Sequence, residues 1–424
     1  MLPQNDTIDN RMKAATASLL LGCFAYPFSI AAFSFFFGLM VVFSLIRFES
    51  FRNGIHVCWY GYRSISIGVL CIIALNIVGI LWSDDTDTAN HKILKQINWL
   101  IVPVVIGISS FIPKLRKYIF IVFSIALFVH LVVCTCQYLG LISITGQGSN
   151  QGDPAGFIGH LSFGFVYSIW AGALLIAAQN FNLKWRVVCY LLAVYAVFSI
   201  FVTEGRSGYL LAFVMLILVL WKAFFHQKIM LKLTAVFLVI ILFILLVFFS
   251  APFQDELQQT MKGITSYING DWRLSEPRLK IWLTSIELWK SSPYFGIGTG
   301  DYYNDAYNLL QKTEFMHLRT WSSYYSHPHN EFLFSLVRWG PIGLLAFIYL
   351  CWAWLSTGWK KDWQHDTMNA YLCTSSALAV IIHGVTEVSL NGKLTLVYAI
   401  LILAFSMTKP LPEEMGEAKE NSQL

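Results

Sequence analysis

Three short segments of the chain carry residue types that suit chemistry on a phosphorylated substrate. They are residues 203–209, a predicted helix start near 278, and residues 326–331. An arginine guanidinium binds phosphate oxygens through two parallel hydrogen bonds and stays charged at any relevant pH. A histidine can accept the proton of an attacking hydroxyl near neutral pH. Two arginines and a histidine at one face therefore predict a site for a pyrophosphate-bearing substrate. The candidate residues are Arg206, Ser207, Arg278, His327, His329 and Asn330.

Each of these candidates also has a purely structural explanation. Arg206 would snorkel from a helix end, Arg278 would be a solvated loop arginine, and His329 would cap a helix. His327 precedes a proline, which holds its backbone extended. His160, at the outer end of a predicted helix, either lines a site or only caps that helix. The sequence leaves these alternatives open.

Arg338 lies about two turns inside a predicted membrane span, where a charge is costly unless it faces protein or water. It therefore requires a polar partner or a wet pocket. His383 and Glu387, one helical turn apart near the outer end of another span, are the candidate partners. A structural ion pair would explain Arg338 as well as a substrate contact would.

Signatures of several common enzyme classes are missing from the sequence. It contains no P-loop, no G-x-S-x-G and no H-E-x-x-H, and His327-Pro328-His329 alone offers too few zinc ligands. The eight cysteines lie in apolar runs or predicted cytoplasmic loops and imply no disulfide framework. The scattered basic residues form no continuous patch for nucleic acid. We therefore expect no metal, no cofactor and no nucleic-acid partner.

The elements that position these residues are predicted to be membrane helices. Hydrophobic residues make up 56% of the 424 positions and charged residues only 12%, which is too little polar surface for a soluble domain. Apolar runs long enough to cross about 30 Å of hydrocarbon alternate with short polar patches. We predict an all-α polytopic fold with one integral-membrane domain over residues 1–424. The twelve predicted spans are approximately 14–28, 30–47, 64–82, 98–112, 118–140, 163–178, 187–202, 208–222, 233–250, 331–357, 367–387 and 394–408.

The distribution of lysine and arginine between short loops predicts the orientation of the chain. With the N-terminus in the cytoplasm, 17 of these residues fall inside, and only Lys92, Lys95, Arg206 and Lys393 fall in short outside segments. All three candidate segments also fall outside. We therefore expect a protein of the bacterial inner membrane, in contact with membrane lipids, whose site faces the periplasm.

One long connection, residues 251–330, separates the ninth and tenth predicted spans. It contains several tryptophans and tyrosines, so it can bury apolar surface, and a loop of this length is usually functional or disordered. Ser275 can cap a helix whose apolar positions are Leu279, Trp282, Leu283, Ile286 and Trp289. That helix should stop near Pro293, before a glycine-rich turn. We predict a large helical periplasmic loop that covers the membrane face.

Together these residues resemble the O-antigen ligase family, whose shared region is the Wzy_C-type membrane domain. The most specific match is H-[NSQ]-x9-G-x-x-G. It reads here His329-Asn330, nine residues that end in Arg338-Trp339, and then Gly340-Pro341-Ile342-Gly343. The family's arginine in a short periplasmic turn is matched by Gly205-Arg206-Ser207-Gly208, and its loop arginine by Arg278.

This resemblance covers the whole chain in topology and residues 160–345 in motifs. It implies a metal-independent, inverting glycosyltransferase of the GT-C-like type in lipopolysaccharide biosynthesis. The donor would be a glycan on undecaprenyl pyrophosphate, and the acceptor a sugar hydroxyl of the lipid A-core oligosaccharide. Arg206 and Arg278 would hold the pyrophosphate as it leaves, and His329 would orient or deprotonate the acceptor. The further substrate-binding residues implied are Asn330, Arg338, His327, His160 and Ser207.

Rival functions share parts of this pattern. The resemblance extends to O-antigen polymerases and protein O-oligosaccharyltransferases, in which the same motifs serve. The single large loop and the short tail, residues 409–424, favour the ligase. A lipid or solute transporter would be expected to show inverted repeats and ionisable residues near the membrane midplane, and we find no repeat. A non-catalytic scaffold would leave the two arginines and the histidine unexplained.

Overall fold

The computed structural model describes residues 10–112, 114–144, 149–203, 205–223, 251–270, 277–318, 326–361 and 366–408, with single residues between some of these stretches. The described residues form helices and no β-strand. The helices are α1 (Asn10–Ala25), α2 (Ile30–Ile46), α3 (Phe48–Gly61), α4 (Arg63–Val78), α5 (Thr86–Gln96), η1 (Ile97–Leu100), α6 (Ile101–Phe111), α7 (Leu115–Tyr138), α8 (His160–Ala178), α9 (Leu183–Val202), α10 (Arg206–Ala223), α12 (Ala251–Ile268), α13 (Pro277–Ser291), α14 (Tyr302–Gln311), η2 (Thr313–Leu318), α15 (Glu331–Lys360), α16 (Thr367–Thr386) and α17 (Lys393–Ser406).

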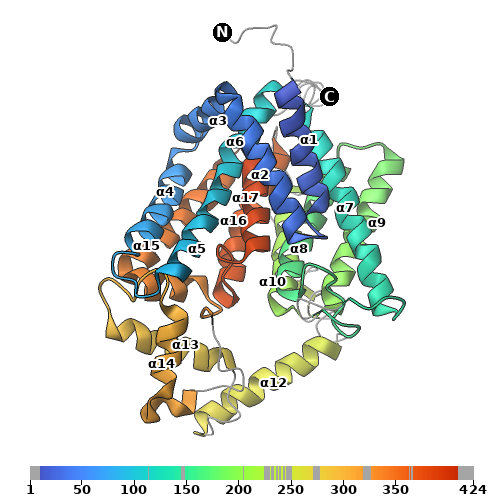
Figure 1. The fold of residues 1–424 in the computed structure, drawn as a ribbon. Helices are drawn as coiled ribbons and strands as arrows, with labels where there is room; N and C mark the ends of the chain where they lie inside the picture. The colour runs from blue at the N-terminus through green and yellow to red at the C-terminus, as the bar shows by residue number, and fades with distance from the viewer. Residues whose placement is uncertain are drawn as a thin grey trace.

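Helices α8, α16 and α17 form the centre of the bundle (Figure 1). Two buried tyrosines fix them together. The Tyr371 hydroxyl of α16 donates to the Ile169 carbonyl at 3.0 Å, and the Tyr398 hydroxyl of α17 donates to the Val166 carbonyl at 3.1 Å. Both acceptors belong to α8. Because a buried hydroxyl needs a partner, these bonds set the register of the three helices.

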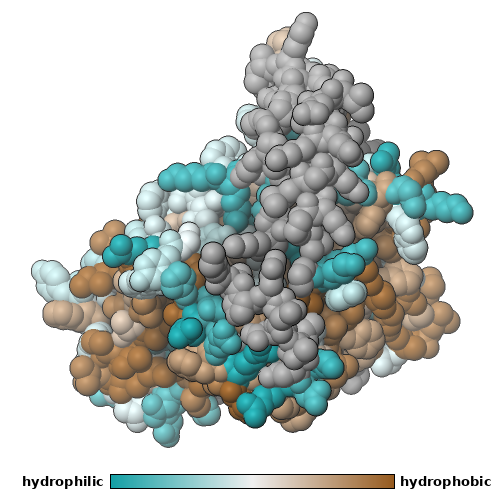
Figure 2. Space-filling model, turned by 90° about the horizontal axis from the view of Figure 1, so that it is seen from above, coloured by the Kyte–Doolittle hydropathy of each residue, from teal (hydrophilic) through white to brown (hydrophobic). Residues whose placement is uncertain are grey.

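The outer helices carry the apolar surface. Leu191, Val194 and Phe198 follow one face of α9 and are 65%, 67% and 63% exposed. Seen from the end of the molecule at which α1 begins, hydrophobic residues cover much of the outer flanks of the described surface (Figure 2). Large apolar side chains on the outside of a helical bundle are what a hydrocarbon environment requires.

The twelve predicted spans are not confirmed. Among the described residues, six helices are long and apolar enough to cross a membrane, or seven if the pair α2 and α3, bent by 101°, is one broken span. Helix α1 has only 16 residues, fewer than the roughly 20 needed. The predicted span 98–112 is the second half of a longer helical stretch, Thr86–Phe111, and 233–250 lies largely outside the described residues. Helix α3 was not predicted.

Residues 251–330 contribute α12, α13 and α14, which lie beyond the end of the bundle opposite the start of α1 (Figure 1). The predicted helix before Pro293 is confirmed as α13, while Ser275 lies outside the described residues. The buried face is shifted from the predicted one, because Ile281, Ser285 and Leu288 are buried, while the predicted Leu283 and Trp289 are only partly buried against the same core. Ser285 shares a 2.7 Å hydrogen bond with the buried Tyr302 hydroxyl of α14, and small side chains allow this closer approach.

A kink in α15 attaches this outer layer to the bundle. Pro341 has no N–H, so the Val337 carbonyl loses its partner within the helix. The Ile297 amide donates to that carbonyl at 2.9 Å, and the Gly298 amide donates to the Arg338 carbonyl at 3.0 Å. The kink residue Gly340 has φ 65° and ψ −161°, a conformation open essentially to glycine alone. The Gly340-Pro341 kink and the glycine-rich turn at Gly298 therefore form one hydrogen-bonded connection between the outer layer and the bundle, which we call the joint.

Residues 296–301, which we call the anchor segment, extend this joint to α4 and α5. The Thr299 hydroxyl donates to the Asn76 carbonyl at 3.0 Å, and the Gly300 amide donates to Ser83 Oγ at 2.9 Å. The Thr299 carbonyl accepts from Lys92 Nζ of α5 at 2.9 Å. The anchor segment thus fixes the end of α4 and the start of α5 against α15.

Candidate functional site

A cavity of about 590 Å³ opens at the end of the bundle where α5, α8 and α17 begin and α16 ends. This size is typical of small-molecule sites. Its wall combines cationic, imidazole and carboxylate groups. The principal polar side chains in the wall are those of Lys92, Lys95, His327, His383, Glu387 and Lys393.

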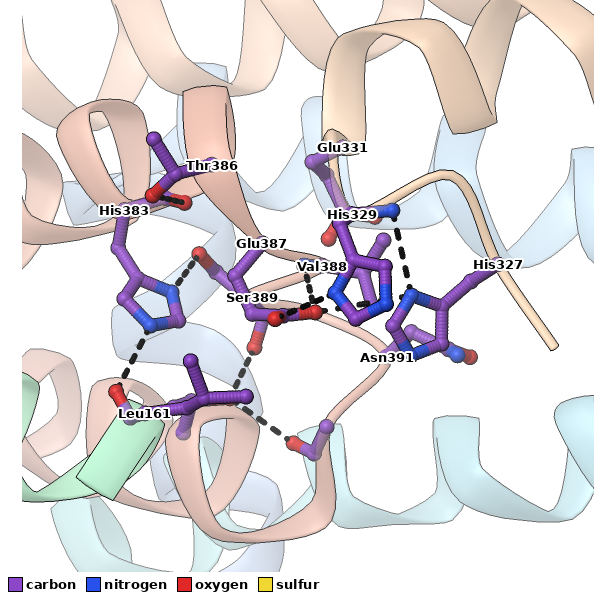
Figure 3. Close-up of polar contacts among 12 residues, drawn as sticks. Leu161, His327, His329, Glu331, His383, Thr386, Glu387, Val388, Ser389 and Asn391 are labelled. Carbon is purple, nitrogen blue, oxygen red and sulfur yellow. Dashed lines mark hydrogen bonds and ion pairs between the residues drawn. The ribbon is translucent and has the colours of Figure 1, made fainter. Parts of the chain in front are cut away.

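His329 borders this cavity through a hydrogen bond to Glu387. The ring nitrogen Nδ1 of His329 lies 2.8 Å from Glu387 Oε2, and the two side chains are 31% and 9% exposed (Figure 3). His329 has φ 50° and is the one non-glycine residue with positive φ among the described residues. Such strain persists only where the surroundings impose it, and it is common at functional sites. It comes just before the α15 cap Asn330.

The turn after α16 holds the carboxylate in place. The Glu387 amide donates to the His383 carbonyl at 2.8 Å, and Glu331 Oε2 accepts from the Leu390 amide at 2.9 Å. Burial opposes ionisation of Glu387. The hydrogen bond from His329 and the electrostatic effect of the two imidazole rings, His329 and His327, outweigh this effect and lower the Glu387 pKa to about 2. Glu387 is therefore an anion at neutral pH.

His327 lies against His329 and remains neutral. The two ring centres are 4.3 Å apart, and His327 Nδ1 accepts from the His329 amide at 3.3 Å. Burial, followed by the His329 charge, lowers the His327 pKa to about 4. Donor atoms of His327, His329 and Glu387 lie within 4.8 Å of one another, and three protein ligands are the number in many catalytic zinc sites. The expectation that this site works without a metal stays a prediction.

The two predicted arginines belong to elements beside this cavity. Gly205 packs closely on α8, since an added Cβ would lie 3.0 Å from the His160 carbonyl. Arg206 then begins α10, but its side chain lies outside the described residues. Arg278, in the first turn of α13, is half-buried and acts electrostatically on His383. His383 in turn reaches the Leu161 carbonyl at 3.0 Å and Ser389 Oγ at 2.9 Å. All three predicted segments thus meet at one end of the bundle, and their chemical roles stay predictions.

Of three further predicted residues, two make structural contacts. His160 Nδ1 lies 2.8 Å from Asp153 Oδ2, and the cavity wall uses its neighbours Leu161 and Ser162 instead. Asn330 caps α15 by accepting from the Leu333 amide at 2.9 Å, and it donates to the Val385 carbonyl at 3.0 Å. Ser207 is the half-buried second residue of α10.

The predicted partners of Arg338 are wrong. Its Nη2 donates to Asn76 Oδ1 of α4 at 2.6 Å, whereas Glu387 contacts the two histidines and His383 contacts Ser389. Arg338 is 4% exposed, and its guanidinium lies 4.0 Å from the Trp339 ring centre. It is not among the residues that line the cavity. Arg338 therefore holds α15 against α4 beneath the site.

Sequence reasoning missed the lysines of the cavity and the role of Glu387. Lys92, Lys95 and Lys393 carried a signal, because they are exceptions to the inward bias of basic residues. The sequence marked Glu387 only as a charged residue near the end of a predicted span and a candidate partner of Arg338. Nothing local in the sequence paired it with His329, which is 58 residues away.

In the described part of the chain, the fold is all-helical, with six or seven helices able to cross a membrane and a polar, lysine-bearing cavity at one end. Residues 191–348 match the sequence model of the O-antigen ligase family, Wzy_C. This match confirms the resemblance over a segment that runs from α9 into α15 and includes Arg206, Arg278, His329 and Gly340. No curated protein matches the chain.

Proposed function

We propose that this protein is an O-antigen ligase. It would transfer a glycan from undecaprenyl pyrophosphate to a sugar hydroxyl of the lipid A-core oligosaccharide at the periplasmic face of the inner membrane. The observation that carries the proposal is the His329–Glu387 pair beside a cationic cavity, within a segment that matches the ligase family. The family match alone supports O-antigen ligase and polymerase chemistry in general.

The His329–Glu387 pair suits a general base. With Nδ1–H donated to the ionised Glu387, Nε2 keeps its lone pair, and the carboxylate stabilises the imidazolium that forms. The acceptor oxygen would bond to the anomeric carbon from the face opposite the leaving group, which inverts that centre. The bond from the anomeric carbon to the pyrophosphate oxygen breaks, and its electrons leave with the pyrophosphate. The acceptor proton passes to His329 Nε2.

Positive charge near the leaving group would supply the remaining stabilisation. Arg206 begins α10 beside α8, and Arg278 lies within electrostatic reach of the cavity residue His383. Guanidinium groups placed on the departing pyrophosphate lower the barrier, because negative charge grows there in the transition state. The donor already carries an activated leaving group, so the transfer reaction would require no nucleotide cofactor.

Complementation tests this proposal. The chain is expressed in a ligase-null Gram-negative strain with a matched core, and lipopolysaccharide ladders are read on a gel. Ladders should return with the wild-type chain and be lost with His329→Ala, Arg206→Ala and Arg278→Ala at equal membrane expression. The matched controls are His56→Ala and Arg52→Ala, exposed residues of α3, which should keep the ladder. Survival of the ladder in all three site variants would remove the site assignment.

The acceptor and the metal requirement are tested in the same strains. Accumulation of undecaprenyl-linked polymer without a ladder would indicate a protein acceptor, and growth of polymer length would indicate a polymerase. Absence of any product would favour the transporter. Transfer by the purified protein should persist in EDTA. Loss of transfer in EDTA, restored by a divalent cation, would instead assign His327, His329 and Glu387 as metal ligands.

A further inference from the structure

Three lysines converge on the cavity, and of the nearby carboxylates Asp301 and Asp85 act electrostatically on Lys92. Lys92 and Lys95 come from α5, and Lys393 is the first residue of α17. Lys92 Nζ donates to the Thr299 carbonyl at 2.9 Å, and Lys95 Nζ donates to the Asn391 carbonyl at 3.3 Å. Within the described part of the chain, none of the three forms an ion pair with an aspartate or glutamate. The cavity's own carboxylate, Glu387, is held by His329.

Two helix N-termini add to this positive potential. Helices α8 and α17 both begin at the cavity, where Leu161, Ser162 and Gly392 form part of its wall. The N-cap residues, Gly159 and Gly392, have no side chain that could accept from the first-turn amides. The first-turn amides of a helix and its dipole favour an anion at such a position. The lysines and the helix ends therefore point to the same kind of ligand.

We propose that this cavity binds a phosphate group of a glycolipid substrate through Lys92, Lys95 and Lys393. Three cations suit a multiply charged phosphate or pyrophosphate better than a single carboxylate. The volume of about 590 Å³ also leaves room for an attached sugar. This inference rests on the proposed function, because that function brings phosphorylated glycolipids to this end of the bundle. The phosphate belongs either to the donor or to the acceptor, and the two sources are separable.

The test uses the full-length protein purified in detergent. The variants are Lys95→Gln and Lys393→Gln, singly and together, because Lys92 also fixes the anchor segment through Thr299. Lys290→Gln is the matched control, since Lys290 is an exposed residue of α13 that pairs with Glu287 at 2.7 Å. The first measurement is the Kd of farnesyl pyrophosphate, a short polyprenyl pyrophosphate. The second is the KM for intact acceptor and for acceptor treated with phosphatase, with melting curves as the check on folding.

If the phosphate belongs to the donor, each lysine change should raise the Kd of farnesyl pyrophosphate about tenfold, the usual effect of losing one charge-assisted hydrogen bond. The KM for acceptor would then stay constant. An acceptor site predicts the reverse, with KM raised about tenfold for intact acceptor only. If every Kd and KM equals that of the control in folded protein, the inference is overturned while the proposed function stands. Lysine-dependent binding in a protein that transfers nothing would overturn the proposed function and keep the phosphate site.

Discussion

Replacing Gly340 with alanine tests whether the α15 kink holds the outer layer on the bundle. An alanine at φ 65° and ψ −161° occupies a region essentially restricted to glycine, at a cost of about 1–3 kcal/mol. Its Cβ would lie 2.2 Å from the Tyr294 carbonyl oxygen, so the turn before the anchor segment must move away. That movement breaks the Ile297–Val337 and Gly298–Arg338 hydrogen bonds, each worth about 1 kcal/mol. We expect a total loss of about 3–5 kcal/mol.

The assay is thermal unfolding of the purified protein in detergent at one fixed scan rate, followed by transfer activity. Gly38→Ala is the matched control, because Gly38 lies within α2 and an added Cβ there meets nothing within 4 Å. The control should unfold at the wild-type temperature or slightly above it. Gly340→Ala should unfold clearly lower, and its transfer should weaken because Lys92 is held by Thr299 of the anchor segment. Equal unfolding temperatures for the two variants would refute this account of the kink.

Three further predictions concern the site and its supports. Glu387→Gln presents an amide N–H to His329 and favours the wrong ring tautomer, so kcat should fall about 10²–10⁴-fold in transfer assays with little change in KM. Burial and two neighbouring carboxylates raise the Asp305 pKa to about 6. The stability of the folded state therefore falls as pH rises from about 4 to 6. Asp305→Asn should melt at a higher temperature than wild type near pH 7.5 and at the same temperature below pH 4. Asn76→Ala leaves the buried Arg338 without its partner and should cost about 1.5–3 kcal/mol in unfolding, partly recovered by adding Arg338→Met.

Local patterns in the sequence predicted local structure well. Helix α13 ends at Ser291, as the proline signal indicates. The face that this helix buries was not predictable in the same way. Its tryptophans gave the stronger apolar signal, but Ser285 and Thr284 are fully buried because small side chains let α13 approach its neighbours. Burial of a small polar residue depends on the surface opposite, which hydrophobic periodicity does not contain.

Long-range partners were beyond the reach of spacing rules. The cost of burying Arg338 correctly predicted a polar partner, yet the partner is Asn76, 262 residues away. Asn76 is uncharged and lies within an apolar helix, so no local rule marked it. The predicted number of twelve membrane spans was not confirmed for a related reason. Hydropathy identifies apolar runs, but the 101° bend between α2 and α3 and the continuity of Thr86–Phe111 depend on tertiary packing.

Three of the four basic residues that break the inward charge bias lie together in the structure. Lysines and arginines in short outside segments are disfavoured during insertion, so their retention calls for a local reason. Lys92, Lys95 and Lys393 meet in one cavity, and Arg206 begins α10 beside the start of α8. The sequence identifies the exceptions, whereas only the fold brings them together. Exceptions to a topological rule on one side of a membrane protein are therefore candidates for ligand binding, and here that ligand would be anionic.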